Sequence, residues 1–131
     1  MNTAVRYYSR SGNTKLVAEA IANALHVKAV SVDTGETQLK EKTDVLFVGG
    51  ALYAYGLDKH LKNYLRNLDP SKVGKAVIFS TSWISRHSID LIRKELSDKG
   101  IPTAEETFYV KNKANAEQLK EAADFALKMS K

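Results

Sequence analysis

The sequence Tyr-Ser-Arg-Ser-Gly-Asn-Thr at residues 8–14 decides the fold of this chain of 131 residues. It continues the apolar, β-rich run Ala4–Ser9 and leads into Thr14–His26, where apolar residues recur at helical spacing. Backbone N–H groups at the start of a helix are unpaired and lie at the positive end of the helix dipole. The stretch is therefore predicted to be an anion-binding loop, and the alternative is that Asn13 or Thr14 simply caps the helix.

The side chains of this loop favour a phosphate monoester as the anion. Glycine at position 12 permits a left-handed turn and close approach, and the hydroxyls of Ser9, Ser11 and Thr14 can donate hydrogen bonds to phosphate oxygens. Neither Gly-x-x-x-x-Gly-Lys-Ser/Thr nor Gly-x-Gly-x-x-Gly is present, so nucleoside triphosphate hydrolysis and a Rossmann-type pyrophosphate site are disfavoured.

Strand and helix patterns alternate along the rest of the chain. Strands are predicted at Val27–Val32, Val45–Gly50, Ala76–Ser80 and Thr103–Val110, and helices at Asp58–Leu68, Ser88–Lys99 and Asn115–Lys128. The polar segment Asp33–Thr43 is ambiguous and is interpreted as one irregular helical turn. This order predicts one α/β domain spanning residues 1–131, with an open, doubly wound parallel sheet. Such sheets bind ligands beyond the carboxyl ends of their strands, so the loops after the first, third and fourth strands are the candidate site.

The loop resembles the phosphate-binding loop of flavodoxins, whose pattern is Ser/Thr-x-Ser/Thr-Gly-Asn-Thr. The resemblance covers the whole chain, and it includes the order of strands and helices, the Val-Gly-Gly end of the third strand and two loops that carry aromatic residues. It implies a flavodoxin-like three-layer sandwich, with a five-stranded parallel sheet in the order 2-1-3-4-5 and helices on both faces. It also implies flavin mononucleotide (FMN) as the cofactor.

The resemblance assigns site residues to three loops. The phosphate loop comprises Ser9, Arg10, Ser11, Gly12, Asn13 and Thr14; the first ring loop comprises Leu52, Tyr53, Ala54, Tyr55 and Gly56; the second comprises Thr81, Ser82 and Trp83. Tyr53 or Tyr55, together with Trp83, is expected to cover the flavin ring, and Gly56 loosely matches a glycine whose peptide flips toward reduced flavin. The alternatives are half-buried loop tyrosines, packing of Trp83 on the following helix, and turn-forming roles for Ser80, Thr81 and Ser82.

Several classes of site are excluded or not expected. The chain has no cysteine, which excludes disulfides, iron–sulfur clusters and a cysteine nucleophile. Its three histidines are interpreted as isolated, without a carboxylate three or four residues on, so no metal site is expected. No apolar run approaches the roughly 20 residues of a membrane span, and the first residues do not have the pattern of a signal peptide. A cytoplasmic protein is the expectation.

The net charge of +5 departs from the acidic character of well-studied flavodoxins. The basic residues are scattered and no RNA-binding motif is present, so nucleic-acid binding is not expected. Around the expected site stand Arg10, Lys15, Lys59, Lys62, Arg86 and Arg93, against Asp58 and Asp90. Positive charges around the site stabilise the anionic reduced flavin. They also favour the binding of redox partner proteins that have acidic docking surfaces.

Three functions compete at this stage. The first is an electron carrier that holds FMN as a monomer and needs no catalytic side chain, since the flavin supplies the chemistry. The second is a small FMN-dependent oxidoreductase acting on quinone- or porphyrin-like substrates, and the third is a flavin-free binding module. The carrier is preferred because the sequence shows no convincing catalytic acid or base.

Overall fold

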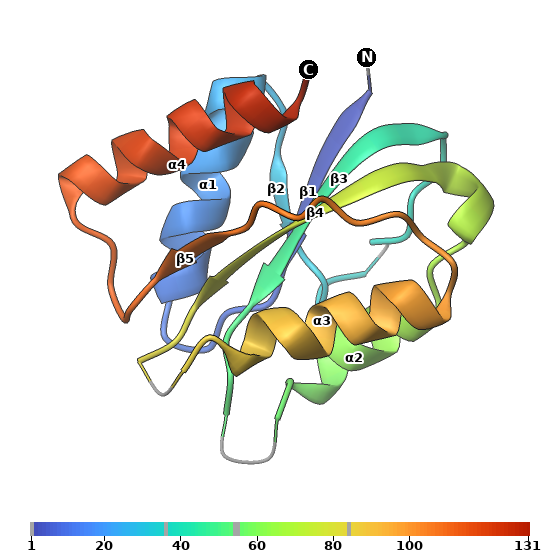
Figure 1. Ribbon diagram of the computed structural model, residues 1–131, viewed down its shortest axis with the longest axis horizontal. Coiled ribbons are helices and arrows are strands. Elements are labelled where there is room, and N and C mark those ends of the chain that lie inside the picture. The colour runs from blue at the N-terminus through green and yellow to red at the C-terminus, as the bar shows by residue number, and fades with distance from the viewer. Residues whose placement is uncertain (1, 36, 54–55, 84) are drawn as a thin grey trace.

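The computed structural model describes residues 2–35, 37–53, 56–83 and 85–131, which form a parallel five-stranded sheet between two layers of helices (Figure 1). The strands, in spatial order, are β2 (Ala29–Ser31), β1 (Thr3–Tyr7), β3 (Thr43–Gly50), β4 (Val73–Thr81) and β5 (Phe108–Val110). The predicted order 2-1-3-4-5 is confirmed. Both chain ends lie at the opposite end of the sheet from the loops that follow β3 and β4.

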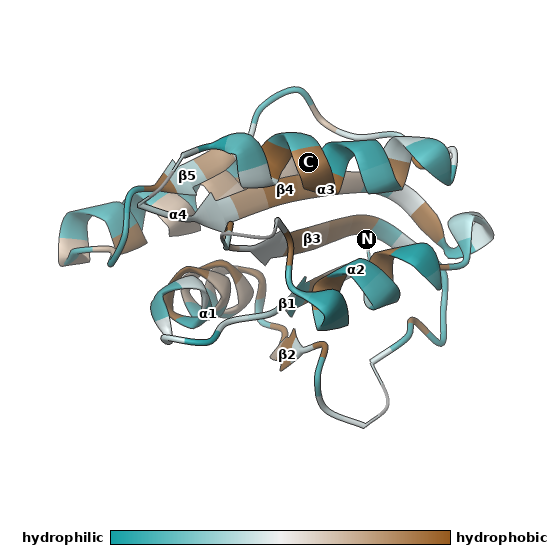
Figure 2. Cartoon of the chain, turned by 90° about the horizontal axis from the view of Figure 1, so that it is seen from below, coloured by the Kyte–Doolittle hydropathy of each residue, from teal (hydrophilic) through white to brown (hydrophobic). Residues whose placement is uncertain are grey.

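Two helices cover each face of the sheet. α1 (Asn13–Leu25) and α4 (Ala116–Met129) lie on one face, and α2 (Lys59–Arg66) and α3 (His87–Asp98) lie on the other. Figure 2 shows the reason for this arrangement: β3 and β4 are hydrophobic in their central parts, whereas the helices are hydrophilic on the sides that face away from the sheet. The predicted three-layer sandwich is therefore confirmed.

The central strand β3 supplies apolar side chains to both layers. Leu46 and Val48 pack in the core under α2 and α3, whereas Val45 and Phe47 pack in the core under α1 and α4. A strand that is buried on both faces must be almost continuously apolar, which is the pattern that predicted it.

The predicted helix ends also agree with the structure. Asp58 caps α2 by accepting a hydrogen bond from the His60 backbone N–H at 2.8 Å. Asn115 and Gln118 form the reciprocal capping box that their spacing predicts at the start of α4. Gly100 takes a φ of +75° directly after α3, where its lack of a Cβ permits the left-handed conformation that ends the helix.

Several segments differ from the sequence prediction. β2 is shorter than the predicted strand Val27–Val32, and β4 begins three residues before the predicted Ala76. The described residues between β2 and β3 contain no helical turn, and side chains hold this connection in place. Arg6 Nε donates to the Thr37 carbonyl at 2.8 Å, and Lys72 Nζ donates to the carbonyls of Leu39 and Lys40 at 3.4 and 3.3 Å. The last strand is also shorter than predicted, because the predicted range pairs with β4 in two separate places. Phe108–Val110 pairs with the final three residues of β4, whereas Thr103 forms only an isolated bridge with Ala76.

In the described part of the chain, no helix has the length and apolarity needed to cross a bilayer.

Candidate functional site

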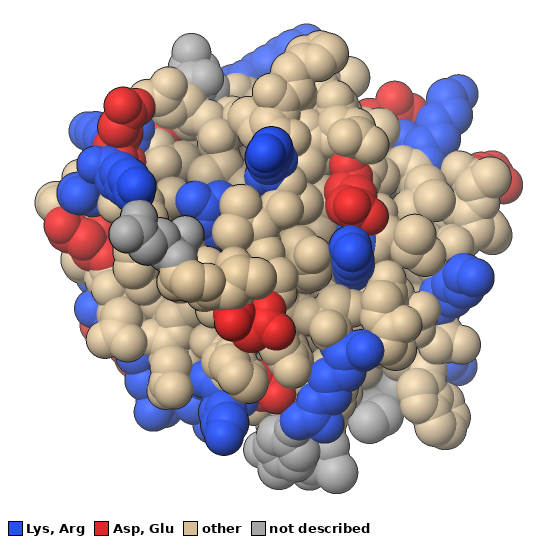
Figure 3. Space-filling model, turned by 180° about the vertical axis from the view of Figure 1, so that it is seen from behind, with Lys and Arg blue, Asp and Glu red and all other residues tan. Residues whose placement is uncertain are grey.

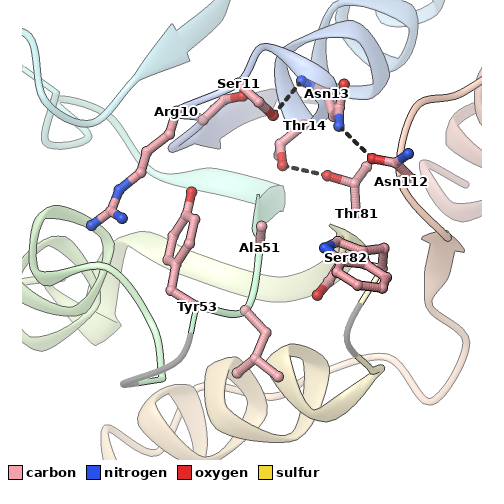
Figure 4. Close-up of a pocket in the computed structure, with 12 residues that line it drawn as sticks. Arg10, Ser11, Asn13, Thr14, Ala51, Tyr53, Thr81, Ser82 and Asn112 are labelled. Atoms are coloured by element: carbon pink, nitrogen blue, oxygen red, sulfur yellow. Dashed lines mark hydrogen bonds between the residues drawn. The ribbon is translucent and has the colours of Figure 1, made fainter.

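A cavity of about 480 Å³ opens at the carboxyl ends of β1, β3, β4 and β5 (Figure 4). This edge of the sheet is where the topology predicts a ligand site. Ten of the predicted site residues line the cavity: Ser9, Arg10, Ser11, Asn13, Thr14, Leu52, Tyr53, Thr81, Ser82 and Trp83. Ala51 and Asn112 also line it.

The first loop leaves the start of α1 open toward this cavity. Gly12 takes a φ of +94° and is the N-cap of α1, and no side chain caps the helix there. The alternative that Asn13 or Thr14 caps the helix is therefore wrong. Ser9 Oγ and Ser11 Oγ instead accept hydrogen bonds from the backbone N–H groups of Gly12 and Asn13, at 3.0 and 3.4 Å. A Cβ at position 12 would meet nothing within 4 Å, so an anion has room to approach the helix start.

Thr14 and Thr81 join this loop to the end of β4. Their hydroxyl oxygens lie 2.6 Å apart, and the two residues are only 1% and 2% exposed. Because one hydroxyl donates to the other, the second keeps its proton for a further acceptor. The turn-forming alternative is wrong for Ser80 and Thr81, which are the last residues of β4; Ser80 Oγ donates to the Gly50 carbonyl at 2.7 Å.

Asn112 is a cavity residue that the sequence analysis missed. It follows β5, takes a φ of 72°, and accepts a hydrogen bond at its Oδ1 from Asn13 Nδ2 at 3.1 Å. Two signals point to it in retrospect. The loop after the fifth strand must end at the same edge of the sheet, and asparagine is among the few residues that readily take a left-handed conformation.

Tyr53 and Trp83 stand on the two loops assigned to the flavin ring. Trp83 is 70% exposed, so the alternative that it packs into the following helix is wrong. Tyr53 is half-buried, and two backbone hydrogen bonds of 2.9 Å join it to Gly56, whose φ is +103°. Gly56 closes this turn and does not line the cavity. The predicted contacts of Ala54 and Tyr55 lie outside the described residues.

Arginine side chains lie against the tyrosines beside both ring loops. The Arg10 guanidinium carbon is 4.1 Å from the centre of the Tyr53 ring. Burial raises the pKa of the Tyr53 phenol above its ordinary value, although the nearby Arg10 opposes that shift. Beside the second loop, Tyr109 donates its hydroxyl proton to the Ser82 carbonyl, and Arg86 lies 5.2 Å from the Tyr109 ring centre. The first contact fixes the Tyr53 ring, and the second fixes the backbone of Ser82, next to Trp83.

The loops at this edge are strongly basic. Residues 9–15, 51–59, 81–87 and 111–115 contain six Lys or Arg residues and one carboxylate, Asp58. Arg93 was expected near the site but does not reach it, because it donates to Thr103 Oγ1 and to the carbonyls of Ala104 and Glu105.

The histidines are not all isolated. His87 Nδ1 lies 3.6 Å from a carboxylate oxygen of Asp90 three residues on, so the expectation that no histidine has such a neighbour was wrong. Among the described residues, no three histidines or carboxylates gather as a metal site would require.

The cavity thus has two chemically different ends. An open helix start with amide and hydroxyl donors suits a phosphate group, and the aromatic walls formed by Tyr53 and Trp83 suit a flat ring. A flavin mononucleotide has both parts, so the residues present fit that cofactor.

Comparison with known proteins agrees with this geometry. The family model described as "Flavodoxin domain" matches residues 4–130. The fold is similar to that of oxidised flavodoxin 1 from Bacillus cereus, with a TM-score of 0.81, 18% identity and coverage of 99% of this chain and 97% of that chain. It is also similar to a flavodoxin from the domain Archaea, with a TM-score of 0.77, 21% identity and coverage of 99% and 96%.

A third similar structure is a short-chain flavodoxin associated with a non-canonical PDU bacterial microcompartment. It has a TM-score of 0.72 and 17% identity, and each chain covers 100% of the other. A search of curated proteins finds no match. The match to the family model spans nearly the whole chain, and the chain therefore belongs to the flavodoxin family.

Proposed function

We propose that residues 1–131 form a single domain that binds FMN and carries electrons between redox partner proteins, as a monomer in the cytoplasm. The observation that supports this most is the cavity itself, with its open helix start at one end and aromatic walls at the other. When bound, FMN supplies the one- and two-electron chemistry, and the protein supplies binding, orientation and electrostatics.

In this proposal the first loop holds the phosphate group. The hydroxyls of Ser9, Ser11 and Thr14 are the donors, and the amides of Gly12 and Asn13 support them by donating to Ser9 Oγ and Ser11 Oγ. Thr14 acts with Thr81, because the second proton of this buried pair is available to a phosphate oxygen. Asn112 keeps the Asn13 side chain at the rim through their hydrogen bond.

The second and third loops hold the ring. Tyr53 is the described aromatic residue of the first ring loop, and the turn closed by Gly56 fixes its backbone. Trp83 lies on the opposite loop and is mostly exposed, so it can cover one face of the ring or move aside at small cost. Leu52, Thr81 and Ser82 complete the lining.

The basic loops determine which partners and which redox state are favoured. Six cations against one carboxylate at this edge stabilise the anionic reduced flavin. The same charges attract partner proteins with acidic docking surfaces. On the face shown in Figure 3, Lys and Arg residues are instead spread out, with Asp and Glu residues between them. We therefore expect the rate of electron transfer to an acidic partner to fall as the salt concentration rises.

The test is an FMN titration of the purified apo-protein, compared with Gly12→Asp and Gly12→Asn. Asparagine and aspartate have nearly the same shape and both tolerate a positive φ, so only the charge separates the two variants. A carboxylate within about 4 Å of a phosphate oxygen costs up to roughly 4 kcal/mol at a protein surface, or about 1000-fold in affinity.

We expect stoichiometric binding by the wild type, a modest loss in Gly12→Asn and near-complete loss in Gly12→Asp. A wild type that leaves flavin fluorescence unchanged would contradict both flavin functions and favour a binding module. Rapid steady-state reduction of a quinone by a nicotinamide donor, catalysed by the FMN-loaded protein without a partner protein, would instead identify an oxidoreductase.

A further inference from the structure

Arg10 belongs to the phosphate loop by sequence, but its side chain extends toward the ring end of the cavity. Its guanidinium carbon lies 4.1 Å from the centre of the Tyr53 ring. In Figure 4 it stands on the side of Tyr53 that faces away from Thr81 and Ser82. One face of the Tyr53 ring is thus covered by a cation, and the other remains toward the cavity.

A buried carboxylate holds Arg10 in this position. Asp58 is 4% exposed, and its Oδ2 accepts a hydrogen bond from Arg10 Nη2 at 3.0 Å. Its Oδ1 lies 2.8 Å from both the backbone nitrogen and the ring Nδ1 of His60. The His60 ring stacks on that of Tyr8, with 5.1 Å between their centres. Asp58 is therefore fixed by the start of α2 and cannot follow Arg10 if Arg10 moves.

Moving Arg10 to a phosphate group would be costly. The movement would break a charge-assisted hydrogen bond and leave a buried carboxylate without its cation. It would also uncover the outer face of Tyr53. The contacts that Arg10 already makes favour its present orientation.

We infer that Arg10 is a positioning residue for Tyr53 and not a ligand of the phosphate group. Asp58 orients Arg10, and Arg10 holds the Tyr53 ring upright against the cavity before the cofactor binds. The inference rests on the proposed function, because it assigns a role within the same FMN site. Arg10, although part of the phosphate-loop motif, is thereby placed at the ring end of the ligand and not at the phosphate end.

A flavin without phosphate separates the two roles. Riboflavin has the ring of FMN but lacks the phosphate group, so a phosphate ligand contributes to FMN binding only. A positioning residue for Tyr53 contributes to both. The experiment measures the dissociation constants of FMN and riboflavin for the wild type, Arg10→Met and Ser11→Ala, by flavin fluorescence.

We expect Arg10→Met to raise the dissociation constants of FMN and riboflavin by the same factor. That factor is about fivefold, which corresponds to the free energy of a partly exposed cation–π contact. Ser11→Ala should weaken FMN alone, because its hydroxyl lies at the phosphate end. Arg10→Lys keeps the charge but loses the planar guanidinium, and it should recover only part of the loss. An Arg10→Met variant that loses FMN affinity and keeps that for riboflavin would overturn the inference.

Two further variants test the route of the effect. In a Tyr53→Leu background, Arg10→Met should change neither affinity further, because the ring that Arg10 supports is gone. Asp58→Asn still caps α2 but no longer binds the guanidinium as an ion pair, so it should weaken both flavins in the same direction as Arg10→Met. An undiminished effect of Arg10→Met in the Tyr53→Leu background would refute positioning through Tyr53. A wild type that binds neither flavin would instead refute the proposed function.

Discussion

Replacing Thr81 by valine tests whether the threonine pair joins the first loop to β4. Valine keeps the shape of threonine but removes the hydroxyl that lies 2.6 Å from Thr14 Oγ1. Because Thr14 is only 1% exposed, its hydroxyl has few other partners within reach. A buried hydroxyl left without a partner costs about 1–3 kcal/mol, and Thr14→Val should cost a similar amount by the same argument. The double variant removes both hydroxyls and should cost less than the sum of the two.

The assay is thermal and urea unfolding of the apo-protein, followed by far-UV circular dichroism. Trp83 is a poor folding signal here, since it is already 70% exposed in the folded state. For a chain of this length, 1 kcal/mol corresponds to a change of roughly 4 °C in Tm. Each single variant should therefore melt about 4–12 °C below the wild type, and the coupling energy from the double-mutant cycle should be about 1–2 kcal/mol.

If the two single effects add up in the double variant, the proposed coupling between Thr14 and Thr81 is refuted. Additivity would mean that each threonine acts through its own packing and that the hydroxyl contact contributes nothing. Flavin binding gives a second check. Both single variants should lose more affinity for FMN than for riboflavin, because the hydroxyl proton that the pair does not use internally is proposed to bind the phosphate group.

Two further predictions concern the core. Burial raises the pKa of Tyr64 to about 12 from its ordinary 10.0, so the fold favours the neutral phenol, and stability present below pH 10 should be lost as the pH rises toward 12. Tyr64→Phe should lose less stability over that range in urea titrations, and at pH 7 it should be at least as stable as the wild type, because the buried hydroxyl has no hydrogen-bond partner among the described residues. Gly49→Ala would place a Cβ 2.4 Å from ring carbons of Phe79 and should cost about 3 kcal/mol or prevent folding. Gly35→Ala meets nothing within 4 Å and should change Tm by only a few degrees; equal Tm values for the two alanine variants would contradict the packing argument.

Much of the fold could be predicted from sequence because its signals are local. The apolar run at Val45–Gly50 indicates a strand buried on both faces, and the structure confirms one there. The cap at Asp58 and the capping box at Asn115 follow from side chains within three residues of the helix start. The helix boundaries agree with prediction to within a few residues for the same reason. The segment between β2 and β3 is held by distant side chains, so its own residues carry no periodic signal.

The candidate site also has one part that local sequence predicts and another that depends on contacts between residues far apart in the chain. The phosphate loop is a contiguous motif in a strand-to-helix context, so its place in the cavity could be predicted. The contact between Thr14 and Thr81 joins residues 67 positions apart, and no local pattern reports it. Asn112 reaches the cavity only because β5 ends at the same edge. The direction of the Arg10 side chain depends on Asp58, 48 residues away, and the contiguous motif carries no signal of that contact.

The connection between β2 and β3 has a consequence for how the protein opens. In this segment Arg6 and Lys72 donate to the carbonyls of Thr37, Leu39 and Lys40, and the side chains of Val32 and Leu39 pack in the core. Because these contacts lack the cooperative hydrogen bonds of a helix or a strand, we expect the segment to detach at a lower free-energy cost than the central strands. Its amides should exchange with deuterium well before those of β3 and β4, and a protease should cut there first. Because the cavity lies at the other loops, a chain nicked between β2 and β3 should still hold its cofactor.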